Sequence, residues 1–238
     1  MNSKQLQRDL QQARAELADF THTVSHDLRA SLRHVTAYVQ IIREDLNGQG
    51  SDALLSHLDQ VSQSARHMGL QIDGLAEMAR LTRVDLQSKP LDLAHMMRDV
   101  CAELAPTFEG RHVQWQFAPD VPSLMGDAGL IRRVLLEVLS NAVKFNRLQS
   151  LAHISVAWAE ADGGQCFISV TDNGVGFNPA YTPKLFHVFQ RLHGAREFEG
   201  LGMGLALTRK IIERHGGTVS AQGGLNAGCC VSFSLALA

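Results

Sequence analysis

The chain has 238 residues, 45% of them hydrophobic, and carries 22 Lys and Arg against 24 Asp and Glu. This length is enough for one or two domains with a packed core. The near-neutral charge argues against nucleic acid as the main partner, because such binders show a clustered basic footprint. No apolar run reaches the ~18 residues of a membrane span, and the N-terminus has no apolar leader segment, so a cytosolic chain is expected.

The four cysteines show no Cys-x-x-Cys pairing. The adjacent Cys229 and Cys230 would point to opposite faces of a strand. We therefore predict small, reduced core residues at Cys101, Cys166, Cys229 and Cys230.

Residues 1–85 have apolar positions that follow a helical period, which later residues do not maintain, so a boundary is expected near residues 84–90. A spacing of 4, 3, 4, 3, 4 predicts a coiled-coil seam at Leu6, Leu10, Ala13, Leu17, Phe20 and Val24, and again at Leu28, Leu32, Val35, Val39, Ile42 and Leu46. Between Val24 and Leu28, a second consecutive step of four forms a stutter, which locally unwinds a supercoil.

A polar turn at residues 47–52 precedes a second helix, for which Asp52 is the predicted N-cap. The second helix repeats the apolar spacing at Leu54, Leu58, Val61, Ala65, Met68, Ile72 and Leu75. Two helices cannot cover two seams by themselves. The sequence therefore predicts a helical hairpin that dimerises into a four-helix bundle.

Residues 86–238 mix helices and strands joined by short links. Strands are expected at residues 86–91, 112–117, 152–159, 165–171, 218–222 and 229–237. Helices are expected at residues 92–108, 127–145 and 204–215. This alternation predicts an α/β sandwich in which helices cover a sheet.

The predicted helix at residues 130–145 has a polar row opposite its apolar face. Glu137, Asn141 and Lys144 follow one another at i, i+4 and i+7. Such a row is often only a solvated face. A carboxylate, an amide and an ammonium in one row could also hold a metal ion and phosphates, because Mg²⁺ prefers oxygen ligands.

The segment Asp172-Asn173-Gly174-Val175-Gly176 follows a predicted strand. Asp-Asn-Gly often forms only a turn. Its carboxylate could also accept a hydrogen bond from an exocyclic amine, while bare glycine backbone lets a flat base approach.

A second glycine-rich segment, residues 200–204, opens the predicted helix at residues 204–215. Backbone N–H groups and the helix dipole at such a start form a phosphate site. The 23 residues from Phe177 to Glu199 include Phe186, Phe189 and Arg191, and inserts of this length often act as active-site lids.

The order of these signals resembles the ATP-binding module shared by sensor histidine kinases, DNA gyrase and the heat-shock chaperone ATPases, over about residues 86–238. By this resemblance, EVLSNAVKFN is the N box, DNGVGF and GLGMGLAL are the glycine boxes, and LFHVFQRL is the F box. The resemblance implies that Asn141 coordinates Mg²⁺, that Lys144 and Arg191 meet phosphates, and that Asp172 binds the adenine amine. It implies further ATP contacts at Gly174, Gly176, Phe189, Gly202, Gly204 and Leu205.

The segment SHDLRASL resembles the H box of a histidine kinase dimerisation domain, and FQRLHGAREFEGLGMGLAL is similar to kinases of the phytochrome type. The resemblance then spans nearly the whole chain. It implies that His26 accepts the γ-phosphoryl group, with Asp27 holding the proton on Nδ1 and Lys144 neutralising charge. His26 occupies a flank position of the heptads and is expected to face solvent at the stutter.

Three positions depart from the family pattern. Ser31 stands where Pro is common, so any bend must come from the stutter. Ala30 replaces the Thr or Asn of phosphatase-competent members, which predicts weak phosphatase activity. Glu137 stands where many kinases have Asn and gyrase-like ATPases have a water-activating Glu, so it is either a metal ligand or a source of ATP hydrolysis.

We predict a homodimeric sensor histidine kinase core, with a phosphoacceptor hairpin at residues 1–85 and an Mg-ATP-binding domain at residues 86–238. The expected partner is the receiver aspartate of a response regulator, and the expected input is an upstream sensor module that is missing or is a separate chain. The rival hypotheses are a gyrase-like ATPase clamp, which Glu137 favours, and a non-catalytic dimeric scaffold.

Overall fold

The computed structural model describes the backbone of residues 3–46, 50–194 and 197–238, and the side chains within these ranges except those of residues 3–20 and 22. The predicted seam from Leu6 to Phe20 and part of the predicted turn therefore lie outside the described side chains and residues. The chain divides into two compact units, Met1–Val84 and Asp85–Ala238, and each is described by itself.

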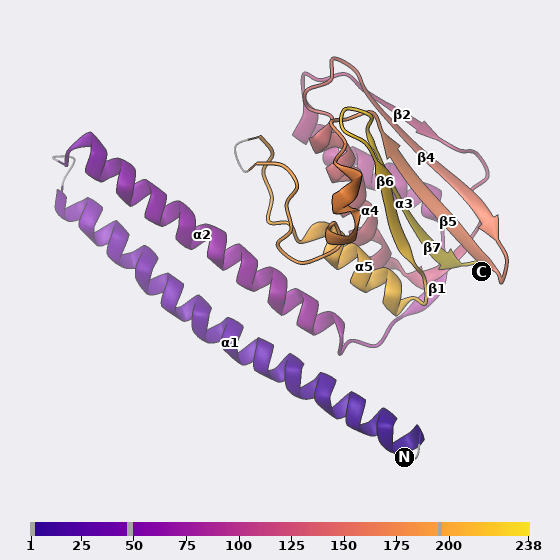
Figure 1. The fold of residues 1–238 in the computed structure, drawn as a ribbon, viewed down its shortest axis with the longest axis horizontal. Helices are drawn as coiled ribbons and strands as arrows, with labels where there is room; N and C mark the ends of the chain where they lie inside the picture. Colours follow the sequence, from indigo (N-terminus) through magenta and orange to yellow (C-terminus); the bar gives the residue numbers. More distant parts are fainter. Residues whose placement is uncertain (1–2, 47–49, 195–196) are drawn as a thin grey trace. The chain divides into compact units, whose positions relative to one another are not determined.

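The first unit is a hairpin of two long helices, α1 (Ser3–Leu46) and α2 (Asp52–Leu81), as Figure 1 shows. The prediction that Asp52 caps α2 is wrong. Ser51 is the N-cap: its backbone is extended, and its hydroxyl accepts a hydrogen bond from the N–H of Leu54 at 3.3 Å. Asp52 is instead the first helical residue, where a carboxylate favours the positive end of the helix dipole.

The described part of the apolar heptad pattern divides into two columns, each with a period of seven residues. One column is buried inside the hairpin, and it includes Val39 of α1 and Leu58, Ala65 and Ile72 of α2. The second column, which we name the outer column, leaves each side chain 39–48% exposed, and it contains Leu28, Val35, Ile42, Leu54, Val61 and Met68. The hairpin therefore buries only half of its heptad pattern.

The second unit is built on a five-stranded sheet of order β2-β4-β5-β7-β6. The strands are β2 (Val113–Phe117), β4 (Ala152–Ala161), β5 (Gln165–Asp172), β6 (Val219–Gly223) and β7 (Cys229–Ala236). β2 and β4 run parallel, and the other pairs are antiparallel. Three helices cover one face of this sheet: α3 (Leu93–Leu104), α4 (Ala128–Phe145) and α5 (Gly204–Arg214) (Figure 1). The predicted α/β sandwich is confirmed.

Two local predictions in this unit are wrong. The helix expected at residues 92–108 ends at Leu104 and continues as a 3₁₀ turn, Ala105–Phe108, because Pro106 cannot donate a helical hydrogen bond. A strand that the sequence did not predict, β3 (Leu124–Asp127), pairs antiparallel with β1 (Ser88–Leu91). β3 is too short to show an alternating pattern.

The core lies between the sheet and the helices and is mostly apolar, although Asn146, Thr208 and Ser234 are buried as well. Its fully buried members include Phe233, Leu93, Leu124, Ile131, Leu135, Leu139, Ile154, Ile168, Ile211, Ile212 and Leu235. All four cysteines are free, but only Cys166 is buried, so the predicted core position holds for that cysteine alone. Of the described helices, none has an apolar stretch long enough to cross a lipid bilayer.

Candidate functional site

The polar row of α4 faces a crowded part of the α/β unit. The helix begins at a firm cap, because the carboxylate of Asp127 accepts hydrogen bonds from the N–H groups of Gly129 and Leu130. Glu137, Asn141 and Lys144 are all half-buried, whereas a purely solvated face would leave them exposed. The row is therefore not a purely solvated face.

The pKa of Lys144 responds to several charged groups near the polar row. Burial lowers the pKa of Lys144, the carboxylates of Glu199 and Glu137 raise it, and the guanidinium of Arg191 lowers it further. Glu199 and Arg191 belong to the loop before α5, so the row and the loop form one charged cluster. The ammonium also lies 4.5 Å from the centroid of the Phe145 ring.

Asp172 ends β5 with its side chain turned away from solvent and only 9% of its surface exposed. Burial raises the pKa of this carboxyl to about 6, and hydrogen bonds from the backbone N–H groups of Gly174 and Cys229 partly oppose that shift. The Gly174 N–H lies 2.8 Å from Oδ1. A buried carboxylate with spare lone pairs can accept a hydrogen bond from a ligand amine.

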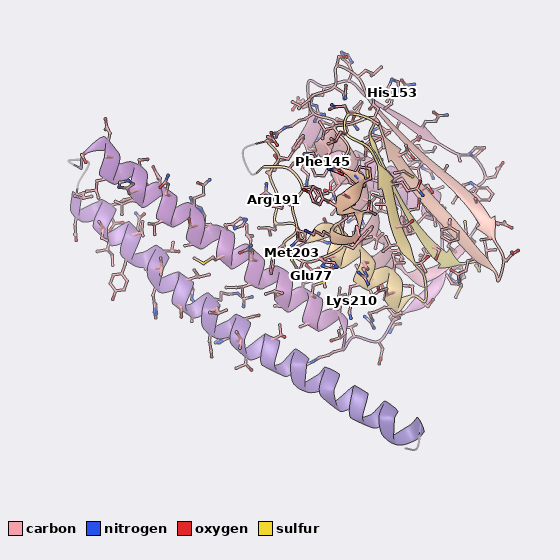
Figure 2. All side chains as sticks on the ribbon, in the orientation of Figure 1. Glu77, Phe145, His153, Arg191, Met203 and Lys210 are labelled. Atoms are coloured by element: carbon pink, nitrogen blue, oxygen red, sulfur yellow. The ribbon has the colours of Figure 1, made fainter. Side chains whose placement is uncertain are left out.

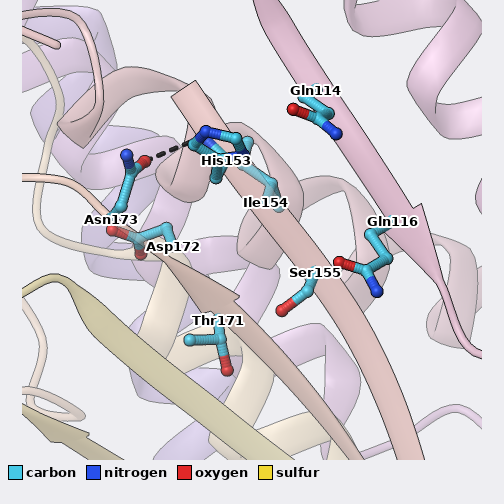
Figure 3. Close-up of a pocket in the computed structure, with 8 residues that line it drawn as sticks. All are labelled: Gln114, Gln116, His153, Ile154, Ser155, Thr171, Asp172 and Asn173. Carbon is cyan, nitrogen blue, oxygen red and sulfur yellow. Dashed lines mark hydrogen bonds between the residues drawn. The ribbon is translucent and has the colours of Figure 1, made fainter. Parts of the chain in front are cut away.

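The next residue, Asn173, fixes the turn that carries Asp172. Its Oδ1 accepts a hydrogen bond from the His153 N–H at 2.8 Å, which Figure 3 shows, and its Nδ2 donates to the Leu151 carbonyl at 3.1 Å. Asn173 and Thr171 line a polar hollow on the exposed face of the sheet, together with Gln114, Gln116 and Ser155. By strand alternation, the Asp172 side chain lies on the opposite, helix-covered face.

The first glycine box packs directly on the end of α4. A Cβ at Gly174 would lie 2.5 Å from the Phe145 carbonyl oxygen, and the Val175 N–H donates to that same oxygen at 3.1 Å. Gly176 has a φ of +58°, and a Cβ there would overlap the carbonyl of Gly224. These positions need glycine because backbone approaches backbone.

The loop between the glycine boxes packs against the end of α4 through aromatic rings. Pro179–Lys184 forms a 3₁₀ turn, and the rest of the described loop has no regular helix or strand. His193 donates or accepts a hydrogen bond at 2.8 Å between Nε2 and the Gly176 carbonyl. The rings of Phe145, His193 and the buried Phe198 lie within 5.0–5.4 Å of one another.

Arginine side chains also hold the loop against the end of α4. Arg147 pairs with Glu199 at 3.0 Å and places its guanidinium 4.5 Å from the centroid of the Phe198 ring. Arg191 donates a hydrogen bond from Nη2 to the carbonyl of Phe198. Phe145 at the end of α4, Arg191 on the loop and Met203 before α5 lie on the same side of the α/β unit (Figure 2).

Sequence reasoning missed His193, Phe198, Arg147 and Glu199. Phe198 had a usable signal, since it is an aromatic residue in a stretch that is otherwise charged or glycine-rich. The other three act through contacts between segments distant in the chain. Such contacts leave no local pattern.

The second glycine box closes the site at the start of α5. Gly202 has a φ of +72°, and a Cβ there would lie 2.6 Å from the carbonyl oxygen of Gln190, one residue beyond Phe189. Phe189 itself has a positive φ of 62°. A Cβ at Gly204 would overlap the carboxylate of Glu137, which also pairs with Arg133 at 2.8 Å. Leu205 is half-buried in the first turn of α5.

Together these contacts bring the predicted nucleotide residues into one region of the α/β unit. Among the described residues, no three His, Cys, Asp or Glu side chains gather as a metal site. Asn141 and Glu137 still offer neighbouring oxygen donors, which fits Mg²⁺ that keeps waters and is shared with phosphates.

His26 and Asp27 lie in the hairpin unit, in the middle of α1. The His26 side chain is 67% exposed, as its flank position predicted. Its Nδ1 lies 3.3 Å from Asp27 Oδ1, a contact between adjacent residues that the sequence had left open. Ser31, at the position where proline is common, donates its hydroxyl proton to the carbonyl of Asp27 at 3.2 Å, and α1 continues as a helix.

Known proteins match this chain in both units. Residues 126–238 match the family described as histidine kinase-, DNA gyrase B-, and HSP90-like ATPase. The adaptive-response sensory kinase SasA of a Synechococcus species is 30% identical over 95% of this chain and 63% of its own length. Cyanobacterial phytochrome A of a Nostoc species is 30% identical over 97% of this chain and 30% of its own length.

Solved structures agree with these relatives. The structure of full-length ShkA in complex with AMPPNP is similar with a TM-score of 0.66 and 25% identity, over 92% of this chain and 46% of that protein. The histidine kinase AdeS of Acinetobacter baumannii shares the fold with a TM-score of 0.58 at 15% identity. The chain spans only 25% of the methanogenesis regulatory histidine kinase FilI of Methanothrix harundinacea, with 28% identity. It therefore corresponds to one part of such longer proteins.

Proposed function

Because residues 126–238 form a histidine kinase-, DNA gyrase B-, and HSP90-like ATPase domain and the chain is homologous to the catalytic core of sensor histidine kinases, we propose that it is a two-component protein-histidine kinase. In this proposal, ATP phosphorylates His26, and the phosphoryl group then passes to an aspartate of a response regulator. The confirmed resemblance to this family covers both units.

The observation that carries the proposal is the contact between His26 and Asp27 on the exposed face of α1. A carboxylate on Nδ1 holds the ring proton there and leaves the Nε2 lone pair free. Nε2 attacks the γ-phosphorus in line, the bond to the β–γ bridging oxygen breaks, and ADP leaves with that electron pair. Asp27 stabilises the positive charge that develops on the ring.

We assign the nucleotide site from the charges and contacts of the α/β unit. Asp172 accepts the adenine amine, and Lys144 lies where it can meet phosphates. Arg191 donates from Nη2 to the Phe198 carbonyl and keeps its other N–H groups for a phosphate. Asn141 and Glu137 would hold Mg²⁺, which shields phosphate charge when bound.

The outer column supports a homodimer. Its six side chains repeat every seven residues on both helices and remain exposed in the single hairpin. A second copy of the hairpin covers the column in a four-helix bundle. His26 belongs to neither column, so the bundle leaves it open to a nucleotide-binding domain and to a receiver domain.

The rival function is a gyrase-like ATPase, which Glu137 would favour as a water-activating base. In the structure, however, Arg133 holds this carboxylate at 2.8 Å. A carboxylate whose oxygen accepts from an arginine has fewer lone pairs left for an attacking water. The kinase therefore stays the preferred function.

The test is to incubate the chain with γ-labelled ATP and Mg²⁺, and to compare wild type with the His26→Gln and His34→Gln variants. His34 is a matched control, since it is an exposed histidine on the same helix. We expect acid-labile, alkali-stable label in wild type and His34→Gln and none in His26→Gln. Release of phosphate without retained label in wild type would favour the ATPase instead.

A further inference from the structure

His215 joins the end of α5 to the start of α4. The residue is the C-cap of α5 and is half-buried. Its ring nitrogen Nδ1 lies 2.8 Å from the carbonyl oxygen of Ile211, one turn back in the same helix. The other ring nitrogen, Nε2, lies 3.0 Å from the backbone nitrogen of Asp127, the N-cap of α4. One side chain therefore contacts both helices.

The two partners determine where the proton of the His215 ring lies. A carbonyl oxygen only accepts, so Nδ1 carries the hydrogen and donates it to Ile211. The Asp127 N–H only donates, so Nε2 has no hydrogen and accepts with its lone pair. One tautomer of the ring thus satisfies both hydrogen bonds, and each nitrogen serves a different helix.

Asp127 is itself held in place, so it gives α5 a fixed point. Its carboxylate caps α4, and its Oδ2 also accepts a hydrogen bond from the Gln87 N–H at 3.1 Å. Burial raises the pKa of this carboxyl, but hydrogen bonds from three backbone N–H groups and the nearby His215 outweigh burial and lower it. The ring also packs on the preceding Gly126, where a Cβ would lie 3.5 Å from Cδ2 of His215.

α4 and α5 lie next to each other in the α/β unit and run in opposite directions (Figure 1). α5 begins at Gly204, which lies against Glu137 of α4. Just before this helix, a Cβ at Gly200 would lie 3.4 Å from the Nζ of Lys144. With 11 residues at about 1.5 Å each, α5 places His215 roughly 16 Å from these contacts. His215 therefore holds the end of α5 that is remote from the proposed nucleotide site.

We infer that His215 is a positioning residue for the polyphosphate of ATP, because it fixes how far α5 extends along α4. The inference rests on the nucleotide site of the proposed function and adds a residue that acts on this site from a distance. A site that holds one ligand between two segments depends on their spacing, since small displacements cost much of the binding energy. Without the bond to Asp127, α5 can shift along α4, and the second glycine box then moves relative to Lys144.

Two substitutions separate the two hydrogen bonds of the ring. The amide of Gln extends about as far as Nε2, so His215→Gln keeps an acceptor for the Asp127 N–H. The amide of Asn ends at about the position of Nδ1, so His215→Asn keeps a donor for Ile211 but does not reach Asp127. The matched control is His95→Asn, because His95 is an exposed histidine of α3 whose Nε2 lies 3.3 Å from Asp99 of the same helix.

The experiment is calorimetric titration of the whole chain with ATP in Mg²⁺ and with adenosine. For His215→Asn we expect ATP to bind about tenfold more weakly, which is the scale of one lost buried hydrogen bond. Adenosine should bind as it does to wild type, because it has no phosphate and its proposed acceptor, Asp172, lies on β5. His215→Gln and His95→Asn should match wild type with both ligands.

Equal losses for ATP and adenosine in His215→Asn would indicate a general loss of folded protein and would overturn the inference. Unchanged ATP affinity in His215→Asn, or the same loss in His215→Gln, would overturn it as well. The proposed function fails separately if wild type binds both ligands but retains no label on His26, and the expected pattern of affinities would then still support the positioning role. If wild type binds neither ligand, both proposals fail.

Discussion

The two units of this chain bury their apolar residues to very different extents. The α/β unit encloses a continuous core around residues such as Phe233, Ile211 and Leu135, which have no exposed surface or almost none. The hairpin buries one column of its heptads and leaves the outer column open. The α/β unit encloses its apolar core by itself, whereas the hairpin leaves half of its heptad positions exposed.

The same contrast applies to the chemical groups. Asp172 lies buried in the α/β unit, where its surroundings shift its pKa, while His26 and Asp27 lie exposed on the hairpin. A nucleotide site needs groups that are fixed before the ligand arrives. The proposed phosphoacceptor, which would meet two different domains, needs access instead. The roles that we propose for the two units therefore agree with their burial.

The largest effect is expected in the complete core. Phe233→Ala should lower the free energy of unfolding of the α/β unit by about 3–5 kcal/mol, because the fully buried ring leaves a cavity. Denaturant unfolding should show this loss at every protein concentration. Val61→Ala, in the outer column, is the matched variant in the hairpin. Its loss of unfolding free energy should depend on the protein concentration. Equal, concentration-independent losses would contradict the contrast between the units.

A charge in the outer column should separate the copies of the hairpin. Val35→Asp places a carboxylate in the proposed interface of both copies and should raise the dimer Kd by about 100-fold, since an unpaired buried charge is strongly disfavoured. Sedimentation velocity over a concentration series measures this change. Ala37→Asp, on the same helix and exposed outside the column, should leave the dimer intact. A stable Val35→Asp dimer would show that another surface joins the copies.

The sequence predicted most elements because the periods of the two units differ clearly. Heptads indicated the two helices of the hairpin, and short alternating runs indicated the strands. The sequence analysis missed β3, which has only four residues and forms its ladder with the equally short β1. The sequence also does not reveal the order of the strands. The parallel pair β2 and β4 joins two segments that α4 separates in the chain.

The site shows a similar limit. Glycines, Asp172 and the row on α4 were predictable because each has a local signature. The contacts of His193 with Gly176 and of Arg147 with Glu199 were not, because they arise only when the loop folds onto α4. The approach of Glu137 to Gly204 depends likewise on how α4 packs against α5. Tertiary packing, rather than residue type, supplies this information.

The buried charge of the α/β unit should make its stability depend on pH. Since burial raises the pKa of Asp172 from 3.8 to about 6, the folded state binds this proton more readily than the unfolded state. Wild type should therefore gain about 1.4 kcal/mol of stability relative to Asp172→Asn between about pH 7.5 and about pH 5. Adenosine affinity should fall over the same range as the acceptor is lost.

Paired denaturant titrations of wild type and Asp172→Asn at the two pH values test this prediction. If the free energies of unfolding of wild type and Asp172→Asn differ by the same amount at both pH values, the Asp172 carboxyl is not buried in solution.

The smallest effect is expected at the exposed turn of the hairpin, where the sequence and the structure disagree about the cap. Ser51→Ala removes the hydroxyl that accepts the Leu54 N–H and should cost about 1 kcal/mol, as losses of N-caps do. Asp52→Ala should cost less, because Asp52 acts only through the helix dipole. Thermal unfolding should show both losses in the hairpin transition alone. A larger loss for Asp52→Ala would restore Asp52 as the cap and shift the start of α2 by one residue.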